Sequence, residues 1–157
     1  MPIFASPLIN PPDKLKAGLA VYRDTLPNGT AGDVALAFPV HVAASRPQAR
    51  QDCEAGLLRF LPEVTGLNRP LRDTDVKGFE AFRQVLARIE RVRYEDIESE
   101  MAVFGDPEYC IDRVHALQRE YGMDEFICYF NQGGIMDHAM VKQSMTSFAR
   151  DVMPYCR

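Results

Sequence analysis

The chain has 157 residues, enough for one domain with a buried core. Its net charge of −4 argues against a nucleic-acid binder, which needs a basic surface. No apolar run approaches the ~20 residues that cross a bilayer. The first residues show no basic segment followed by an apolar one, so we expect a cytoplasmic protein without a signal peptide.

The first 26 residues predict a strand followed by a helix. The apolar run at 3–8 is typical of a strand. Asn10 is the expected N-cap, and the two prolines after it favour a helix start. Apolar residues then recur at helical spacing and give this helix one buried stripe, made of Leu15, Leu19, Tyr22 and Leu26.

Residues 34–42 form the strongest predicted strand. They are apolar almost without alternation, as in a central parallel strand. Pro39 conflicts with a central position because proline removes a ladder donor. Either the strand is irregular near its C-terminal end, or a neighbouring strand is missing. Ser45 and Gln48 then predict a capping box, before a helix that buries Ala49, Cys53, Leu57 and Leu61.

Residues 62–100 are predicted to form a linker, a helix and a charged surface segment. Glycine, asparagine and proline recur over 62–74, which predicts a linker. Residues 75–93 predict a helix with one apolar face, made of Phe79, Phe82, Leu86 and Ile89. Arginines near its end are followed by an acidic run at 94–100, which we interpret as a solvated, salt-bridged surface.

Residues 101–134 organise the rest of the chain as a short strand, a helix, a buried strand and a glycine loop. Asp106 is placed as N-cap, Pro107 suits the first helical position, and Gly122 stops the helix. The apolar run 126–130 is typical of a parallel strand covered on both faces. A last helix at 137–153 follows, with an apolar face made of Val141, Met145, Phe148 and Val152.

Three motifs in this region resemble the end of the bacterial luciferase-like monooxygenases. They are Phe104-Gly105-Asp106-Pro107-Glu108, Tyr121-Gly122-Met123-Asp124-Glu125-Phe126 and Phe130-Asn131-Gln132-Gly133-Gly134. In that family a Gly-x-Pro-Glu element opens the seventh barrel helix and a Gly-Val-Asp-like turn enters the last strand. In one branch an Asn-x-Gly-Gly turn leaves that strand. The chain end at 148–154 and the run 38–43 are also similar to the family.

The resemblance implies an α/β fold, because the family consists of flavin-dependent (β/α)8 barrels. A closed barrel needs eight strands, and only three clear strands and one short one are found here. The chain, 1–157, is therefore expected to be a single domain that forms part of a TIM barrel, roughly strands 6–8. It would be a truncated gene product, a subunit of a split enzyme or an excised piece. Residues 66–100 would be the helical insertion that the family carries beside its active site.

The resemblance also implies a reaction. The complete enzyme would use reduced FMN and O2 to oxidise a small organic substrate, with a deazaflavin as the alternative cofactor. The family's flavin-phosphate residues come mainly from earlier strands, which this chain lacks. Flavin binding is therefore expected to need a complementary N-terminal half-barrel.

Candidate cofactor residues follow the C-terminal ends of strands, where β/α barrels carry their functional groups. In the loop of Asn131, Gly133 and Gly134, glycine backbone can approach a flat ligand and Asn131 offers a donor and an acceptor. The alternative is a turn that requires positive φ and is tied down by Asn131 itself. His41 lies near the C-terminal end of the strongest predicted strand, where it would meet the flavin or the substrate. The alternative is a core histidine whose ring is hydrogen-bonded to backbone.

Other chemistry is poorly represented in the sequence. The four cysteines fit no metal spacing and are expected to be reduced, buried or half-buried thiols. No His-Glu-x-x-His, Gly-x-Ser-x-Gly, phosphate loop or GxGxxG fingerprint occurs. We therefore assign no metal site and no catalytic residue.

Two other functions compete with the enzyme fragment. A partial barrel exposes sheet edges, which are templates for association with a partner or with a second copy of the chain. A non-catalytic module of this kind is the first alternative. The second is an unrelated α/β domain whose Asn-Gln-Gly-Gly loop binds a small ligand.

Overall fold

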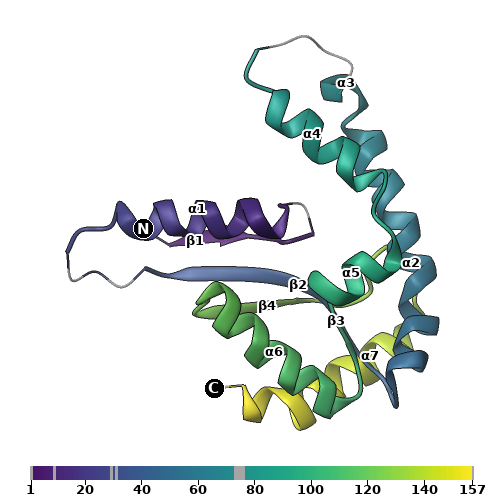
Figure 1. The fold of residues 1–157 in the computed structure, drawn as a ribbon. Helices are drawn as coiled ribbons and strands as arrows, with labels where there is room; N and C mark the ends of the chain where they lie inside the picture. Colours follow the sequence, from purple (N-terminus) through teal and green to yellow (C-terminus); the bar gives the residue numbers. More distant parts are fainter. Residues whose placement is uncertain (1, 9, 29, 31, 73–76, 157) are drawn as a thin grey trace.

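A parallel sheet around strand β2 (Val34–Val42) forms the centre of the molecule. The computed structural model describes residues 2–8, 10–28, 30, 32–72 and 77–156. The other strands, β1 (Ile3–Ala5), β3 (Val103–Gly105) and β4 (Glu125–Tyr129), all pair with β2 in parallel (Figure 1). The α/β class is confirmed, and β2 has the predicted bounds.

Strand pairing explains how a central strand tolerates Pro39. The pairing with β1 ends at Leu36 and the pairing with β3 begins at Val40, so Pro39 lies outside both. Residue 39 is paired only with Tyr129 of β4. Backbone N–H groups alternate between the two edges of a strand, and Val34 directs its backbone to β4 by accepting from Asp124 N–H at 2.9 Å. An odd-numbered residue such as Pro39 therefore directs its missing N–H away from β4.

The short strand β3 interrupts a simple order in which each strand pairs with the next one along the chain. In the part of the chain that the structure describes, β4 pairs with β2 and has no ladder with β3. The burial of β4 is correspondingly lower than predicted: its two end residues are exposed and its three middle residues are half-buried. The expectation of a last strand covered on both faces was wrong, because β4 lies at the margin of this small sheet.

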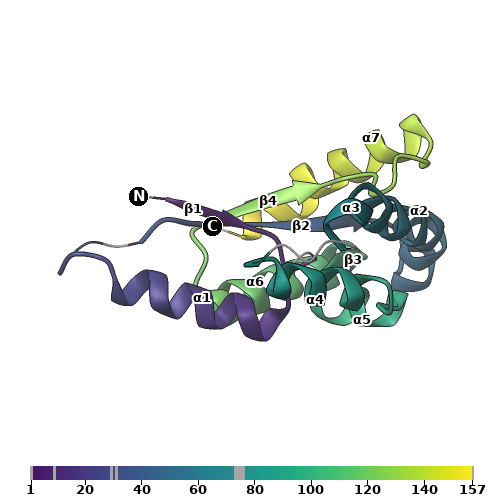
Figure 2. The same ribbon diagram turned by 90° about the horizontal axis from the view of Figure 1, so that it is seen from above.

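Helices α1 (Pro12–Asp24) and α6 (Pro107–Tyr121) lie together on one side of the sheet (Figure 2). The even-numbered side chains of β2 point toward them and form the main core with Leu15, Leu19, Val114 and Leu117. The prediction that Asn10 is the N-cap of α1 was wrong. Pro11 occupies that position, and the side-chain amide of Asn10 donates to Ser6 O at 3.1 Å.

The opposite face of the sheet is covered only in part. A second core packs α2 (Arg46–Leu67) and α5 (Tyr94–Glu100) against Phe104 of β3. Away from these helices, Phe4 is 59% exposed and Tyr129 is 41% exposed. They pair in register with Ala35 and with Pro39, two odd-numbered residues of β2, so they share one face of the sheet.

Helix α2 is longer than predicted, and the linker prediction for 62–74 was wrong. The helix continues through Pro62 to Leu67, and a short helix α3 (Arg69–Arg72) follows; residues 73 and 74 lie outside the described residues. The predicted N-cap and buried face are confirmed: Ser45 Oγ accepts from Gln48 N at 3.3 Å, and the four predicted core residues are buried. The capping box is not completed, because the Gln48 side chain donates to Asp52. Packing of Leu57 and Leu61 in the second core carries the helix past its proline.

Residues 80–100 also differ from the prediction. Helix α4 (Glu80–Ile89) is shorter than the predicted 75–93 and buries Leu86 and Ile89; residues 75 and 76 lie outside the described residues. The acidic run forms α5, with Tyr94 and Ile97 buried. The predicted salt-bridged surface is confirmed for its acids, since Glu95 pairs with Arg50 and Asp96 pairs with Arg93. Figure 1 shows α3 and α4 at the far end of α2, away from the sheet.

The last third of the chain follows the predicted pattern most closely. Asp106 caps α6 by accepting from Tyr109 N at 3.0 Å, and Gly122 ends it in the left-handed region with φ of 58°. Helix α7 (His138–Ser147) continues into a π-helical turn η1 (Phe148–Val152) and a 3-10 turn η2 (Met153–Tyr155). Phe148 and Val152 are buried as predicted, but Met145 is half exposed. Over the described residues, no helix is both long and apolar enough to span a membrane.

Candidate functional site at the carboxyl end of the sheet

His41 occupies the second-last position of β2 and is only 2% exposed. Its Nε2 lies 2.9 Å from Asp52 Oδ2 on α2, and the Asp52 side chain is itself nearly buried. The second carboxylate oxygen, Oδ1, accepts from Gln48 Nε2 at 2.8 Å. The imidazole is thus held by a carboxylate, and not by backbone as one of the two sequence interpretations supposed.

Sequence reasoning missed Asp52. A usable signal existed, because Asp52 stands directly before the buried Cys53 on a helix capped at Ser45. An acidic residue at the margin of a buried helix face requires a partner. The partner, His41, is on a strand eleven residues earlier, so only the packing of α2 on β2 identifies it.

The Asn131–Gly134 loop follows β4 and folds onto itself. Asn131 adopts a positive φ of 60°, and its Oδ1 accepts from Met136 N at 2.9 Å. Gly134 N donates to Asn131 O at 3.0 Å and closes the turn. Asn131 therefore ties down its own loop, and its carboxamide oxygen is already used.

Two glycines allow this loop to lie directly on α2. A Cβ at Gly133 would overlap the carbonyl oxygen of Gly56, and a Cβ at Gly56 would overlap the carbonyl oxygen of Gln132. Gly133 also has a positive φ of 85°. Gly134, by contrast, faces open space, with no atom within 4 Å of a Cβ built on it. Gly133 therefore allows close packing on α2, whereas Gly134 leaves its backbone exposed.

Ser144 of α7 completes this end of the sheet. It is 1% exposed, and its hydroxyl accepts from Val42 N at 2.9 Å, beyond the last residue that pairs with β4. An N–H left unpaired there would be costly. The residue was not singled out from the sequence. The last residues of β2, α2, the Asn131–Gly134 loop and α7 therefore converge at one place.

Reactive groups are few at this end of the sheet. Burial, with a smaller contribution from Asp52, raises the pKa of the Cys53 thiol to about 12, so it stays protonated at neutral pH. The other histidines lie elsewhere: His115 Nε2 is 2.8 Å from Tyr155 O, and His138 is exposed at the start of α7. Within the described ranges, no group of three or more His, Cys, Asp or Glu could hold a metal ion.

The four predicted cofactor residues do not enclose a flavin by themselves. His41 and the loop are brought to the same end of the sheet and both contact α2. However, His41 is buried and paired, Gly133 is covered by α2, and the 1070 Å³ cavity between α1, α4, α5 and α6 is lined by none of the four. A flavin pocket here would need walls that these residues do not supply.

No family model matches the chain, and no curated protein matches it in sequence. Solved structures do match. A monooxygenase from Streptomyces bottropensis shares 18% identity with a TM-score of 0.62, and the match covers 99% of this chain and 42% of that protein. The oxygenating constituent of 3,6-diketocamphane monooxygenase, from a Pseudomonas putida plasmid and solved with FMN, shares 18% identity with a TM-score of 0.61. There the match covers 98% of this chain and 42% of that one.

A more distant match is the coenzyme F420-dependent tetrahydromethanopterin reductase from Methanopyrus kandleri. It shares 12% identity with a TM-score of 0.51, over 93% of this chain and 43% of that one. The likeness to luciferase-like proteins is thereby confirmed at the level of the fold. The chain spans about 42% of the length of the first of these structures.

Proposed function

We propose that this chain is the C-terminal part of a luciferase-like, flavin-dependent monooxygenase that works in the cytoplasm. The observation that supports this most is the fold match over nearly the whole chain to less than half of two monooxygenases, one solved with FMN. In the complete protein, reduced flavin would supply the oxygen chemistry with O2, and the substrate would be a small organic molecule. The Methanopyrus match keeps a deazaflavin as the alternative cofactor.

The chain's own contribution would be to shape one wall of the cofactor pocket. The exposed backbone at Gly134 and the carboxamide nitrogen of Asn131 are the groups of the loop that a flavin would meet. His41 and Asp52 would hold the floor beneath it, because their buried pair joins β2 to α2. Residues 66–100, most of which form helices α3 to α5, would be the insertion beside this wall.

The missing walls would come from a complementary chain that carries the earlier strands. Since β4 has one edge without a described partner, it could pair with such a chain once that chain is present. In this proposal β1, β2 and β4, which already pair in that order, would be strands 6, 7 and 8 of a (β/α)8 barrel, and β3 would be a short additional strand. The isolated chain is then inactive.

Titration with FMN, followed by quenching of flavin fluorescence, tests the proposal. The chain alone is expected to leave the fluorescence unchanged, and the chain co-purified with a complementary N-terminal half-barrel encoded beside it is expected to quench it. Gly134→Val in the complex should abolish quenching. Gly78→Val is the matched control, because Gly78 also has a positive φ and open space around it but lies before α4. A stable complex that leaves FMN unquenched would overturn the proposal.

A second candidate function is a non-catalytic module that associates through the sheet. The observation that favours it is the partly open face that carries Phe4 and Tyr129, two large apolar side chains that solvent reaches. Size-exclusion chromatography with light scattering decides it. A dimer that Phe4→Ser converts to monomer, with FMN binding absent in every complex, would support the module. A clean monomer at high concentration would count against it.

A further inference from the structure

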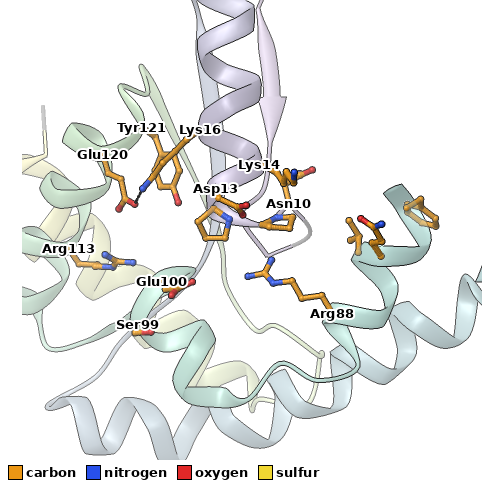
Figure 3. A pocket seen from close by; sticks show the side chains of 15 residues that line it. Asn10, Asp13, Lys14, Lys16, Arg88, Ser99, Glu100, Arg113, Glu120 and Tyr121 are labelled. Atoms are coloured by element: carbon orange, nitrogen blue, oxygen red, sulfur yellow. Dashed lines mark ion pairs between the residues drawn. The ribbon is translucent and has the colours of Figure 1, made fainter. Parts of the chain in front are cut away.

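A cavity of about 1070 Å³ lies on the helix-covered side of the sheet. Helices α1 and α6 form one side of it, and α4 and α5 form the other (Figure 3). Its volume is of the order that encloses a small organic ligand. None of the predicted cofactor residues lines it, so it needs an explanation of its own.

Two residues that line this cavity each carry a buried hydrogen-bond donor with no partner among the described residues: the Tyr121 hydroxyl and Arg113 Nη2. Tyr121 is 2% exposed. The guanidinium of Arg113 is otherwise fixed only by a long contact of 3.4 Å from Nε to Ala102 O. Buried polar groups are nearly always paired in native proteins. Two unpaired donors on residues that line one cavity therefore indicate an acceptor that comes from outside the chain.

The two donors are close enough to influence each other. Burial, with smaller contributions from Glu120 and Glu100 and against the opposing effect of Arg113, raises the pKa of Tyr121 to about 12. The hydroxyl therefore stays protonated at neutral pH, and it can donate a hydrogen bond to an anion. Figure 3 shows Tyr121 and Arg113 entering from α6 on one side and Arg88 reaching in from α4 on the other.

An exposed ion pair lies beside the Tyr121 ring. Lys16 Nζ lies 2.6 Å from Glu120 and 5.7 Å from the centre of the Tyr121 ring. Exposed ion pairs contribute little stability, so a ligand can displace Glu120 at small cost and take Lys16 as a further partner. Two other acids, Asp13 and Glu100, also line the cavity. With Glu120 the lining has three acids and four cations, and its net charge is therefore +1. The cations are Lys14, Lys16, Arg88 and Arg113, and the acids are Asp13, Glu100 and Glu120.

The apolar part of the lining comes from Pro11 and Pro12 at the start of α1 and from Phe82 and Val85 of α4. A ligand that fits both parts of the lining has one negative charge and an apolar body. We propose that this cavity binds a small aliphatic or aromatic carboxylate, whose oxygens accept hydrogen bonds from Arg113 and Tyr121 while its apolar body packs between α1 and α4.

Isothermal titration of the chain with octanoate at neutral pH tests the proposal, with octanol as the uncharged probe of the same length. Octanoate should bind with one-to-one stoichiometry and octanol at least tenfold more weakly, since a hydrogen bond to a charged group carries about a tenfold effect or more. Tyr121→Phe, which keeps the ring and the packing, should weaken octanoate about tenfold. Arg113→Gln should weaken it at least as much.

Three matched variants separate the site from general effects. Tyr155→Phe and Arg119→Gln change exposed residues outside the cavity and should leave octanoate binding unchanged. Glu120→Gln removes the competing carboxylate and should strengthen binding several-fold, whereas Glu108→Gln, exposed at the start of α6, should not. The proposal would be overturned if octanol and octanoate bound equally well, or if octanoate gave no saturable heat up to about 10 mM. It would also be overturned if Tyr121→Phe and Arg113→Gln left the affinity for octanoate unchanged.

Discussion

At the scale of single residues, glycine decides the candidate site more than any reactive side chain does. Gly56 and Gly133 let two backbone segments touch where any side chain would overlap a carbonyl group. The neighbouring Gly134 has the same unusual backbone region, φ of 70°, but open surroundings. Steric exclusion and backbone strain can therefore be separated within one tetrapeptide.

We expect Gly133→Ala to lower the free energy of unfolding by about 3 kcal/mol or more, because the methyl group must push the loop from α2. Gly134→Ala should cost only about 1 kcal/mol, the strain of a left-handed residue with a side chain. Urea denaturation of both variants, followed by circular dichroism, measures the difference. Equal losses would mean that the loop does not rest on Gly56.

At the scale of elements, local capping signals specified the starts of α2 and α6, whereas the breaker residues did not specify the end of α2. Asp106 and Ser45 cap their helices as predicted, and Gly122 stops α6. By contrast, the breakers after Leu61 did not break α2, which runs through Pro62 to Leu67. Buried contacts of Leu57 and Leu61 outweigh the local preference of the proline.

Proline at two helical positions gives a prediction about elements. Pro62→Ala should raise the free energy of unfolding by about 2 kcal/mol, because an interior proline is about 3 kcal/mol worse than alanine and stiffens the unfolded chain only modestly. Pro107→Ala should give no gain, since proline at the first turn of α6 loses no hydrogen bond. Urea midpoints of the two variants decide this, and a gain at Pro107 as large as at Pro62 would contradict it.

At the scale of the whole molecule, buried cysteine thiols make the stability of the fold decrease at alkaline pH. Burial raises the pKa of Cys53 and of Cys110 from 9.0 to about 12 in the folded chain. A raised folded pKa stabilises the fold fully below the unfolded value. That stability is lost as the pH rises from about 9 toward about 12, because unfolding then releases thiols that ionise.

We expect the urea midpoint to be flat between pH 7 and 8.5 and to fall above pH 9, by up to about 1.4 kcal/mol per pH unit for each of these thiols. Cys53→Ala should reduce the slope by one group even if it lowers the stability at every pH. Equilibrium unfolding from pH 7 to 11 measures it. A midpoint that stays constant to pH 11 would show that the thiols are not buried.

Sequence alone determined the elements with local signals: the bounds of β2, the capped start of α2, and α6 with its aspartate cap and glycine stop. Those features depend on residues within a few positions of one another, so hydrophobic period and capping chemistry suffice to predict them. It also pointed to a fold that the solved structures share.

Only the tertiary structure decided that β4 lies beside β2, that Asp52 holds His41, and that two donors on residues lining one cavity lack partners. Each of these depends on contacts between segments far apart in the chain or on the space left between helices. No local pattern encodes such a contact, because the burial that makes it favourable exists only after the elements have packed.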